Sequence, residues 1–403
     1  MRLHCKQPYI FMENRYDRRG VSASKDEVHA AIKHLDKGIF PLAFCKVLPD
    51  VVGADERFCN VMHADTAGTK TSLAYLYWRE TGDLNVWKGI AQDAIVMNLD
   101  DMGCIGCFDN IVLSSTIGRN KNLVSGEVIK AIIEGCSEFL DTLNSHNVRV
   151  FLAGGETADV GDIVRTADVG YTTFARMERD KVVVNDIHPG QVVVGLASYG
   201  QAIYESAYNS GIGSNGLTSA RHDVLSNYYA ENFPDSFDAN TPSDVVFTGS
   251  KRLTDTIATS AGLFTVGQLL LSPTRTYLPF IKPLVSRFGK SIKGLIHCSG
   301  GGQTKVQKFL QPHTCVIKDN FFETPPVFQL IQQESNTNWK EMYQVFNMGC
   351  RLEVYLPNAE TAQQVIELAN SFGIEAQVIG KTIAQDQAEP SVQMVTTYGT
   401  FKY

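Results

Sequence analysis

The sequence predicts an α/β or α+β protein of two domains, and three observations support this. The chain has 403 residues, which is more than one hydrophobic core usually holds. Strand-like and helix-like segments alternate along it. A polar stretch with a Pro-Gly turn, ERDKVVVNDIHPGQ at 178–191, separates two halves. We therefore expect a first domain over 1–176 and a second over 177–403.

The first half contains four runs rich in apolar and β-branched residues, typical of strands. They lie at 41–49, 58–65, 110–117 and 165–177. Two longer segments, at 85–103 and 125–146, repeat apolar residues at intervals of three and four, as amphipathic helices do. This order of elements predicts a sheet covered by helices.

The second half opens with the apolar strand VVVGLAS at 192–198. It ends with a strand at 352–357, a helix at 361–373 and a strand at 376–380. Between them, the polar stretch from Leu225 to Thr254 predicts a surface excursion, with an insertion at about 225–250.

Composition excludes several classes of protein. Hydrophobic residues make up 44% and charged residues 20%, as in soluble globular proteins. The net charge of −7 argues against a nucleic-acid partner, and no apolar run suggests a membrane span or signal peptide. Nine scattered cysteines suit reduced thiols, so we expect a cytoplasmic protein. Cys104 and Cys107 are either two small buried residues or a metal or redox pair, without further ligands at matching spacing.

The first candidate site is the stretch HADTAGTK at 63–70. It is not a Walker A loop, because Thr69 and Ala64 stand where that motif needs glycines. A strand ending in Asp65 and followed by Gly68, Thr69 and Lys70 nevertheless offers a metal ligand, a close backbone approach and a cation. These suit a metal-bound polyphosphate. The alternative is a surface turn with a chance ion pair.

The helix expected at 85–103 carries acidic residues on its apolar background. Asp93 and Asp101 are about 80° apart on a helical wheel, so they share roughly one face. A buried carboxylate needs a partner or a metal ion. Asp100 lies about 100° from Asp101 and is expected to face solvent as readily as to take part in a site.

A third motif is the run VFLAGGETADVGD at 150–162, an apolar strand that leads into Gly154, Gly155, Glu156 and Thr157. Two glycines let backbone amides approach a ligand, and Glu156 can hold a cation. A tight turn explains the same pattern without a ligand.

Two glycine-rich loops occur in the second half. Gly211, Gly213 and Gly216 fit G-x-G-x-x-G, but a dozen residues separate them from the preceding strand, which argues against a dinucleotide fold. A phosphate or sugar loop with Ser214, Asn215 and Arg221 as contacts is the better interpretation. The loop from Ser299 through Gly300, Gly301 and Gly302 follows a strand and precedes a helix-like segment, where exposed amides and a helix dipole could receive an anion or simply form a crossover.

Together these motifs resemble the phosphoribosylformylglycinamidine cyclo-ligase (aminoimidazole ribonucleotide synthetase) family. The family's D-G-V-G-T-K appears as DTAGTK, its V-N-D as LDD, and its G-G-E-T-A unchanged at 154–158. Its S-N-G with a downstream arginine appears as SNGLTSAR at 214–221, its L-x-P-T-R-x-Y as LSPTRTY at 271–277, and its G-G-G at 300–302. Its E-M-Y-x-x-F-N-x-G is EMYQVFNMG at 341–349, and the resemblance runs from about Tyr16 to Gly380.

The resemblance implies ATP-dependent closure of formylglycinamidine ribonucleotide to aminoimidazole ribonucleotide, ADP and phosphate. It also implies two mixed-sheet domains, the first pairing its sheet with that of a second copy in a homodimer, with ATP nearby. Lys70 would neutralise phosphate oxygens, and Gly68, Thr69 and residues 154–157 would contact ATP. The expected Mg²⁺ ligands are Asp65, Asp93, Asp101 and Glu156, with Asp65, Lys70 and Asp101 as catalytic residues. The expected substrate contacts are Ser214, Asn215, Gly216, Gly300, Gly301 and Gly302.

The chain departs from the family pattern at several positions. Thr66 and Ala67 replace Gly and Val beside Asp65, and Gly213 stands where a histidine usually precedes S-N-G. Two other functions therefore remain open. A small-molecule kinase of the same superfamily would release a stable phosphorylated product, and a non-catalytic homologue would bind ATP without turnover.

Overall fold

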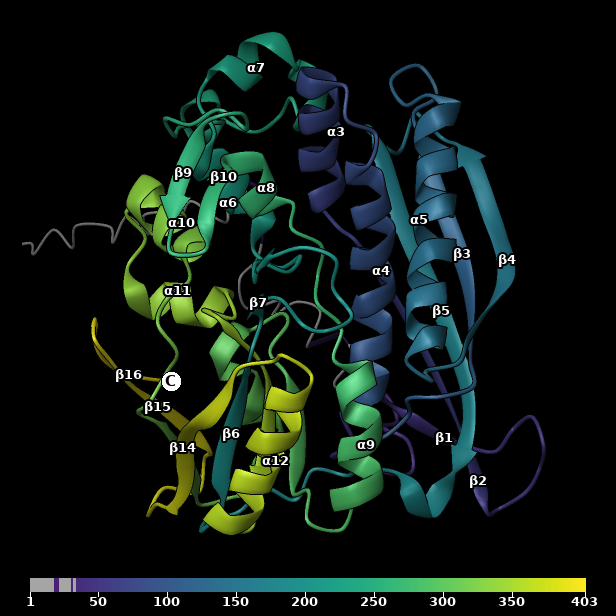
Figure 1. Ribbon diagram of the computed structural model, residues 1–403, viewed down its shortest axis with the longest axis vertical. Helices are drawn as coiled ribbons and strands as arrows, with labels where there is room; N and C mark the ends of the chain where they lie inside the picture. The colour runs from purple at the N-terminus through teal and green to yellow at the C-terminus, as the bar shows by residue number, and fades with distance from the viewer. Residues whose placement is uncertain (1–17, 22–29, 32–33) are drawn as a thin grey trace, which may run out of the picture.

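The computed structural model describes residues 18–21, 30–31 and 34–403. The start of the resemblance near Tyr16, and the beginning of the expected first domain, lie outside these ranges. The protein contains two mixed sheets with helices packed on and between them (Figure 1), which confirms the expected fold class. None of the described helices combines the length and the apolar character needed to cross a membrane.

The first sheet has five strands in the order β1-β2-β5-β3-β4. Neighbours are antiparallel, except that β3 and β4 are parallel. Helices α3 and α4 lie between β2 and β3 in sequence, and α5 lies between β3 and β4. The bounds are β1 Val47–Pro49, β2 Phe58–Thr66, α3 Lys70–Thr81, α4 Val86–Gly103, β3 Ile111–Arg119, α5 Gly126–Ser145, β4 Val150–Asp159 and β5 Ala167–Glu178.

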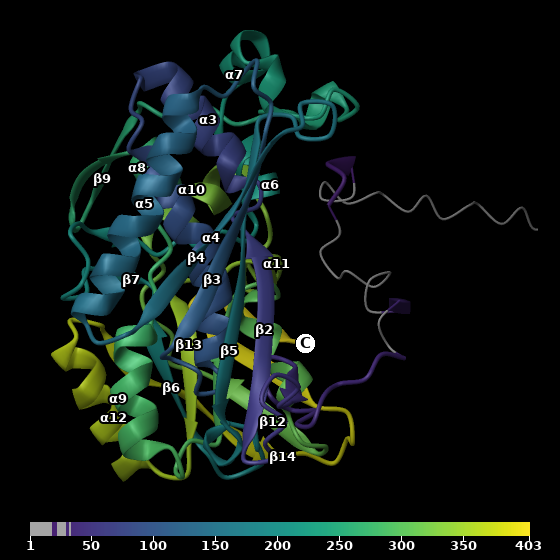
Figure 2. The same ribbon diagram turned by 90° about the vertical axis from the view of Figure 1, so that its right-hand side faces the viewer.

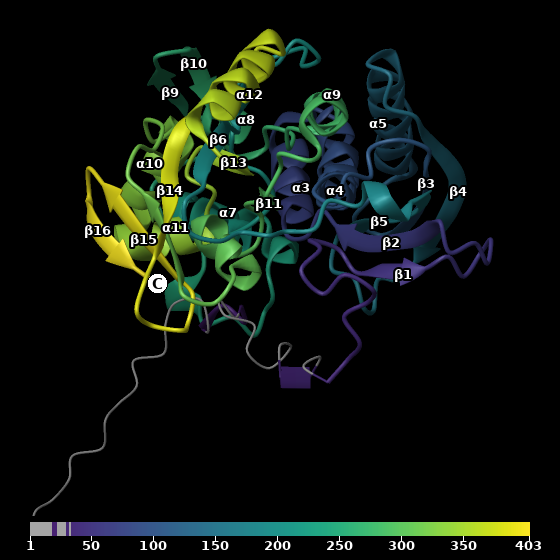
Figure 3. The same ribbon diagram turned by 90° about the horizontal axis from the view of Figure 1, so that it is seen from below.

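The helices cover one face of this sheet only. Seen from below (Figure 3), the strands curve around α3, α4 and α5, and α4 lies between this sheet and the second domain. Figure 2 looks toward the strands, where β2, β5 and β3 run side by side. Of the described elements, α4 is buried over almost its whole surface, because it packs on strands on one side and on the second domain on the other.

Most expected elements of the first half are confirmed. The strand expected at 58–65 is β2, and the helices expected at 85–103 and 125–146 are α4 and α5. The strand expected at 41–49 is wrong for its first part, because residues 41–45 form turns and bends that bury Ala43 and Cys45 without a strand partner. The eight cysteines within the described ranges are free and buried, as expected for reduced thiols.

The second sheet has seven strands in the order β11-β13-β6-β14-β12-β15-β16, with only β12 and β15 parallel. Helices α9 and α12 lie together in front of it in Figure 1. Its strands are β6 Val192–Ala197, β11 Gly294–His297, β12 Thr314–Lys318, β13 Cys350–Leu356, β14 Ala376–Ala384, β15 Ser391–Thr396 and β16 Gly399–Lys402.

The expected strand–helix–strand at the end of the chain is confirmed as β13, α12 and β14. Two small strand pairs, β7 with β8 and β9 with β10, lie outside the main sheet. The remaining α-helices and strands are β7 Tyr199–Gly200, β8 Asn209–Ser210, α6 Leu217–Val224, α7 Tyr228–Asn232, β9 Thr256–Thr259, β10 Gly262–Thr265, α8 Val266–Leu270, α9 Leu278–Phe288, α10 Pro326–Ser335, α11 Trp339–Val345 and α12 Ala359–Ser371. The 3₁₀ helices are η1 Arg179–Lys181, η2 Pro234–Ser236, η3 Ser243–Val245 and η4 Gly302–Phe309.

The polar stretch from Leu225 to Thr254 has buried aromatic residues despite its composition. Tyr229 is fully buried, and its hydroxyl donates to Oε2 of Glu80 on α3 at 2.5 Å. Arg252 also binds Glu80, at 2.6 Å. This stretch therefore contacts the first half of the chain as well as the second.

A buried ion pair lies beneath η4 in the second sheet. Lys318 of β12 and Glu353 of β13 are both fully buried and bind each other, and Lys318 Nζ donates to the backbone oxygen of Gln303 at 2.7 Å. Tyr355 donates to the second carboxylate oxygen of Glu353 at 2.7 Å.

We predict that Lys318→Met lowers the free energy of unfolding by about 3–5 kcal/mol, because it leaves the Glu353 carboxylate buried without its cation. Chemical denaturation of the single variant and of Lys318→Met/Glu353→Met measures this. The double variant should recover part of the loss. A single variant as stable as the wild type would contradict the prediction.

A second ion-pair group joins the two halves at the loop after α4. Asp109 accepts hydrogen bonds from Arg149 at 2.9 Å and from Lys282 of α9 at 3.1 Å. Partial burial raises the pKa of Asp109, but these hydrogen bonds outweigh burial and lower it to about 2.

A depressed carboxyl pKa contributes stability above the unfolded-state pKa, near 4, that is lost as pH falls toward 2. We predict that Asp109→Asn lowers stability at pH 7 by about 1–2 kcal/mol, and that the difference from wild type shrinks between about pH 4 and pH 2. Thermal unfolding at several pH values measures this, with Asp141→Asn on the exposed side of α5 as the control. A difference that stays constant over this pH range would refute it.

Candidate active site

The two halves meet where residues 272–277, which we term the strap, lie along α4. Asp93 Oδ1 accepts hydrogen bonds from the backbone nitrogen of Thr274 at 2.8 Å and from its hydroxyl at 2.5 Å. Lys70 Nζ donates to the same carboxylate oxygen at 2.8 Å and to the backbone oxygen of Ser272 at 2.6 Å. The Lys70 and Asp93 side chains are fully buried.

This arrangement changes what Lys70 can do. Burial lowers the pKa of Lys70, while the charge and hydrogen bond of Asp93 oppose that shift. Its ammonium is enclosed between Asp93 and the strap, so it would have to leave Asp93 to reach a phosphate oxygen. In this conformation Lys70 connects the two halves.

Asp100 binds the strap about two turns further along α4. It accepts hydrogen bonds from the Thr276 hydroxyl at 2.7 Å and from the backbone nitrogen of Tyr277 at 3.1 Å. Of the two alternatives for Asp100, the solvent-facing one is excluded, because the residue is fully buried. Because α4 is packed on both sides, it has no solvent-facing side on which a helical wheel could place Asp100.

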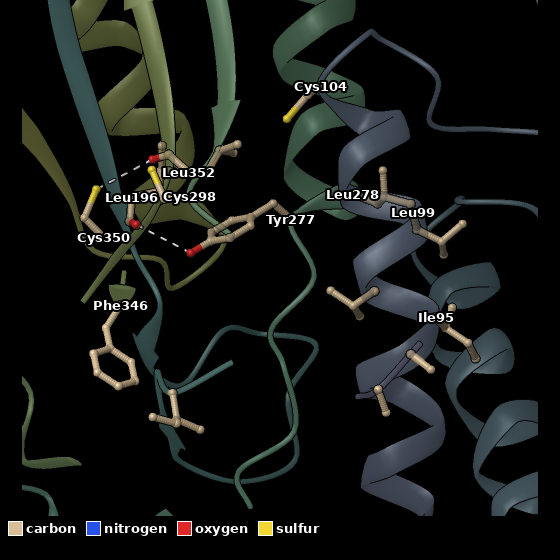
Figure 4. Packing of buried hydrophobic residues seen from close by; sticks show 14 of the residues in the cluster. Ile95, Leu99, Cys104, Leu196, Tyr277, Leu278, Cys298, Phe346, Cys350 and Leu352 are labelled. Carbon is tan, nitrogen blue, oxygen red and sulfur yellow. Dashed lines mark hydrogen bonds between the residues drawn. The ribbon is translucent and has the colours of Figure 1, made fainter. Parts of the chain in front are cut away.

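The strap continues into the hydrophobic core. Figure 4 shows Tyr277 extending from the strap toward Leu196 of β6. Its hydroxyl donates to the backbone oxygen of Ala197 at 2.9 Å. At the end of α4, a Cβ on Gly103 would lie 2.9 Å from side-chain atoms of Leu278 and Ile281, so the missing side chain permits this close packing.

Asp101 binds two histidines that sequence patterns did not point to. His297 at the end of β11 lies 2.6 Å from Asp101, and His63 of β2 lies 3.4 Å from it. Burial raises the pKa of Asp101, but the hydrogen bonds and charges of the two histidines outweigh burial and hold that pKa well below its usual range. The sequence did contain one indication for His63. It lies two residues before Asp65 on the same strand, so the two side chains point to the same face of the sheet.

Asp65 is the most accessible of the expected acids on this side of the sheet. It is partly exposed, and its carboxylate accepts a hydrogen bond from the backbone nitrogen of Thr66 at 2.8 Å. Nearby, the Thr69 hydroxyl lies 2.5 Å from that of Thr218 on α6, so the motif at 63–70 also touches the second half.

The four expected metal ligands do not gather in one place. Strand register puts Asp65 opposite Tyr171, Ser115 and Gly155, whereas Glu156 lies in the next row, with its side chain on the other face. Within the described ranges, no group of three or more His, Cys, Asp or Glu side chains could hold a metal ion. A metal cage made of all four carboxylates therefore does not fit this chain. Asp65 alone, partly exposed, suits Mg²⁺ whose other ligands are phosphates and water.

The glycine motif at 154–157 lies within β4 and not in a turn after it. A Cβ on Gly155 would lie 1.9 Å from Ser115 Oγ, at a point where the pairing of β3 with β4 shifts register. Gly155 is therefore required by close strand packing, while Glu156 and Thr157 are exposed on this edge strand.

The two loops of the second half meet beside the strap. Ser214 Oγ lies 3.4 Å from Thr274 Oγ1, and a Cβ on Gly300 would lie 3.6 Å from Asn215 Nδ2. Gly216 precedes α6, and the helix-like segment expected after the loop at 300–302 is the 3₁₀ helix η4. Residues 214–216 and Gly300 remain at least partly exposed, so they can contact a ligand.

The segment EMYQVFNMG holds these loops in place. Asn347 donates to the backbone oxygen of Gly211 at 2.9 Å and accepts from the Ser198 hydroxyl at 3.0 Å. Gln303 in turn donates to the backbone oxygens of Asn347 and Cys350, each at 2.6 Å. The motif thus acts as the support that both loops share.

Comparison with known proteins gives this arrangement a family. Residues 48–177 match the model for the N-terminal domain of AIR synthase related proteins, and residues 188–393 match the model for the C-terminal domain. The phosphoribosylformylglycinamidine cyclo-ligase of Methanocaldococcus jannaschii is 29% identical over 85% of this chain and 83% of its own length. The enzyme of the same name from Methanococcus maripaludis strain C6 is 30% identical over 80% of this chain and 77% of its own.

Among solved structures, phosphoribosylformylglycinamidine synthase II from Thermotoga maritima is similar in fold. It superposes with a TM-score of 0.51 at 13% identity, covering 92% of this chain and 46% of the larger protein. The matches to both family models, together spanning most of the sequence, lead to one conclusion: the chain belongs to the AIR synthase related protein family.

Proposed function

We propose that the protein closes the ring of formylglycinamidine ribonucleotide, using ATP, to give 5-aminoimidazole ribonucleotide, ADP and phosphate in purine biosynthesis. One observation carries this proposal. The motif at 63–70 from the first half and the loop at 214–216 from the second half both contact the strap. The relatives named phosphoribosylformylglycinamidine cyclo-ligase match at least four fifths of this chain.

The chemistry requires activation of a poor leaving group. The terminal phosphoryl group of ATP is transferred to the formyl oxygen, and the amidine-side nitrogen then attacks the formyl carbon. The bond from that carbon to the phosphorylated oxygen breaks, phosphate leaves, and the nitrogen loses a proton. Charge gathers on the transferring phosphoryl group, so positioning and electrostatics supply most of the catalysis.

The residues of this chain divide that work. Asp65 would hold Mg²⁺ on the ATP phosphates, and the ion would neutralise negative charge there. Gly68 and Thr69 lie beside it, at the contact with α6. Ser214, Asn215, Gly216 and the loop at 300–302 would bind the ribose phosphate. Lys70, Asp93 and Asp101 orient this site through the strap and His297. We place the reaction in the cytoplasm.

The outer face of the first sheet suggests a homodimer. Four side chains in register across β2, β5, β3 and β4 point away from the helices. They are Met62, Phe174, Val112 and Phe151, of which Met62 is 63% and Phe151 53% exposed. An apolar row of this kind marks an interaction surface, and it fits a second copy of the chain.

We predict that Asp65→Asn lowers kcat by about 100-fold or more while the melting temperature stays within ~2 °C, because Asp65 is partly exposed and makes one local side-chain hydrogen bond. Phosphate release and the diazotisable aminoimidazole product, followed together with Mg²⁺-ATP and the ribonucleotide, measure this. The control is Asp141→Asn, an exposed acid on α5.

Wild-type protein that transfers a phosphoryl group from ATP to give a stable phosphorylated product, without aminoimidazole, would point to a kinase. Protein that binds ATP and forms neither product would point to a non-catalytic homologue. Either outcome would overturn the proposed reaction, whereas a fully active Asp65→Asn variant would remove only Asp65 from the metal site.

We predict that Val112→Glu converts the protein to a monomer, because it places a charge in the middle of the apolar row. Light scattering during gel filtration measures the mass. Leu263→Glu is the matched control, since Leu263 is also exposed, at 68%, but lies on β10 in the second half. A wild-type protein that is already monomeric would disprove the homodimer.

A further inference from the structure

Arg351, the second residue of β13, is a buried cation without an acidic partner at ion-pair distance among the described residues. The residue is 2% exposed. Among the described residues, its guanidinium donates one hydrogen bond to a side chain, from Nη2 to the sulfur of Met97 on α4 at 3.7 Å. No partner among the described residues accepts a hydrogen bond from Nε or Nη1.

The carboxylates around Arg351 are already bound elsewhere. Burial lowers the pKa of Arg351, and the charges of Asp100, Asp93 and Asp101 oppose that shift. Yet Asp93 binds Lys70, Asp100 binds the strap, and Asp101 binds His297. A buried charge that lacks its own hydrogen-bonded partner is costly, so its retention calls for an explanation.

The position of the guanidinium supplies that explanation. A Cβ built on Gly213 would lie 3.5 Å from Arg351 Nη1, so Gly213 leaves space beside the guanidinium where any other residue would put a side chain. Gly213 leads directly into Ser214, Asn215 and Gly216, which are partly exposed. The cation therefore lies immediately behind the loop that would bind a phosphate.

We propose that Arg351 is a substrate-binding residue whose guanidinium, with Ser214 and Asn215, completes a site for a phosphate dianion. This rests on the proposed function, which it deepens by naming the cation. The planar guanidinium matches two phosphate oxygens at once, which a lysine does not. The phosphate has two possible sources, the 5′-phosphate of the ribonucleotide and the phosphoryl group that leaves ATP.

Steady-state kinetics of Arg351→Met and Arg351→Lys test the proposal and separate the two sources. If Arg351 binds the 5′-phosphate, Arg351→Met raises the KM for the ribonucleotide roughly 10- to 100-fold and leaves the KM for ATP unchanged. If it binds the transferring phosphoryl group, kcat falls by a similar factor and the KM for the ribonucleotide holds. Arg351→Lys keeps the positive charge but cannot bind two phosphate oxygens at once, so its defect should lie between those of the wild type and Arg351→Met.

Arg287→Met is the matched control, because Arg287 is exposed on α9 and only stacks on Phe288. Titration calorimetry with the ribonucleotide, and separately with inorganic phosphate, tests the same site without turnover. A wild-type protein that binds the ribonucleotide but forms no aminoimidazole would sink the proposed reaction and leave this site testable. Arg351→Lys should then bind either ligand at least several-fold more weakly.

Two results would overturn the assignment of Arg351. One is that Arg351→Lys and Arg351→Met match wild type in kcat, both KM values and ligand affinity. The other is that wild-type protein binds neither the ribonucleotide nor phosphate. Should Arg351→Met fail to fold, as its melting curve would reveal, Arg351→Lys carries the comparison alone.

Discussion

The buried carboxylates of α4 are the constraint on which the rest of the structure depends. Asp93 and Asp100 would be costly inside the protein without partners, and the strap at 272–277 supplies backbone and hydroxyl donors to both. Because the strap belongs to the second half of the chain, satisfying these acids also docks the two halves. Lys70 adds its charge to the same contact.

The positions of the loops at 214–216 and 300–302 depend on this docking of the two halves. Thr274 binds Asp93 with its backbone nitrogen and lies beside Ser214, so the loop at 214–216 faces the first half. Asn347 and Gln303 fix the same loop and the loop at 300–302 from behind. A chain of hydrogen bonds thus runs from α4 to both loops. Under the proposed function, it would hold the ATP contacts of one half at a defined distance from the substrate contacts of the other.

The fold was predictable wherever a periodic pattern was strong, and the site was predictable only as a set of motifs. Helices α4 and α5 and strand β2 follow from apolar spacing. The burial of Asp100 could not be predicted from the sequence, because α4 is packed on two sides and has no polar face with which to compare it. Residues 154–157 looked like a strand end, yet pairing with β3 carries the strand through both glycines. The contacts of His297 and Arg351 with α4 join residues 196 and 254 positions apart in sequence, which no local pattern encodes.

A crystal structure of the protein with Mg²⁺, a non-hydrolysable ATP analogue and the ribonucleotide tests this account most directly. We expect the ribonucleotide phosphate within hydrogen-bond distance of Ser214 or of the amides at 300–302. We expect the triphosphate beside Asp65, with the hydrogen bonds from the strap to Asp93 and Asp100 unbroken. A ribonucleotide bound away from the two loops, or a complex in which the strap leaves α4, would contradict it.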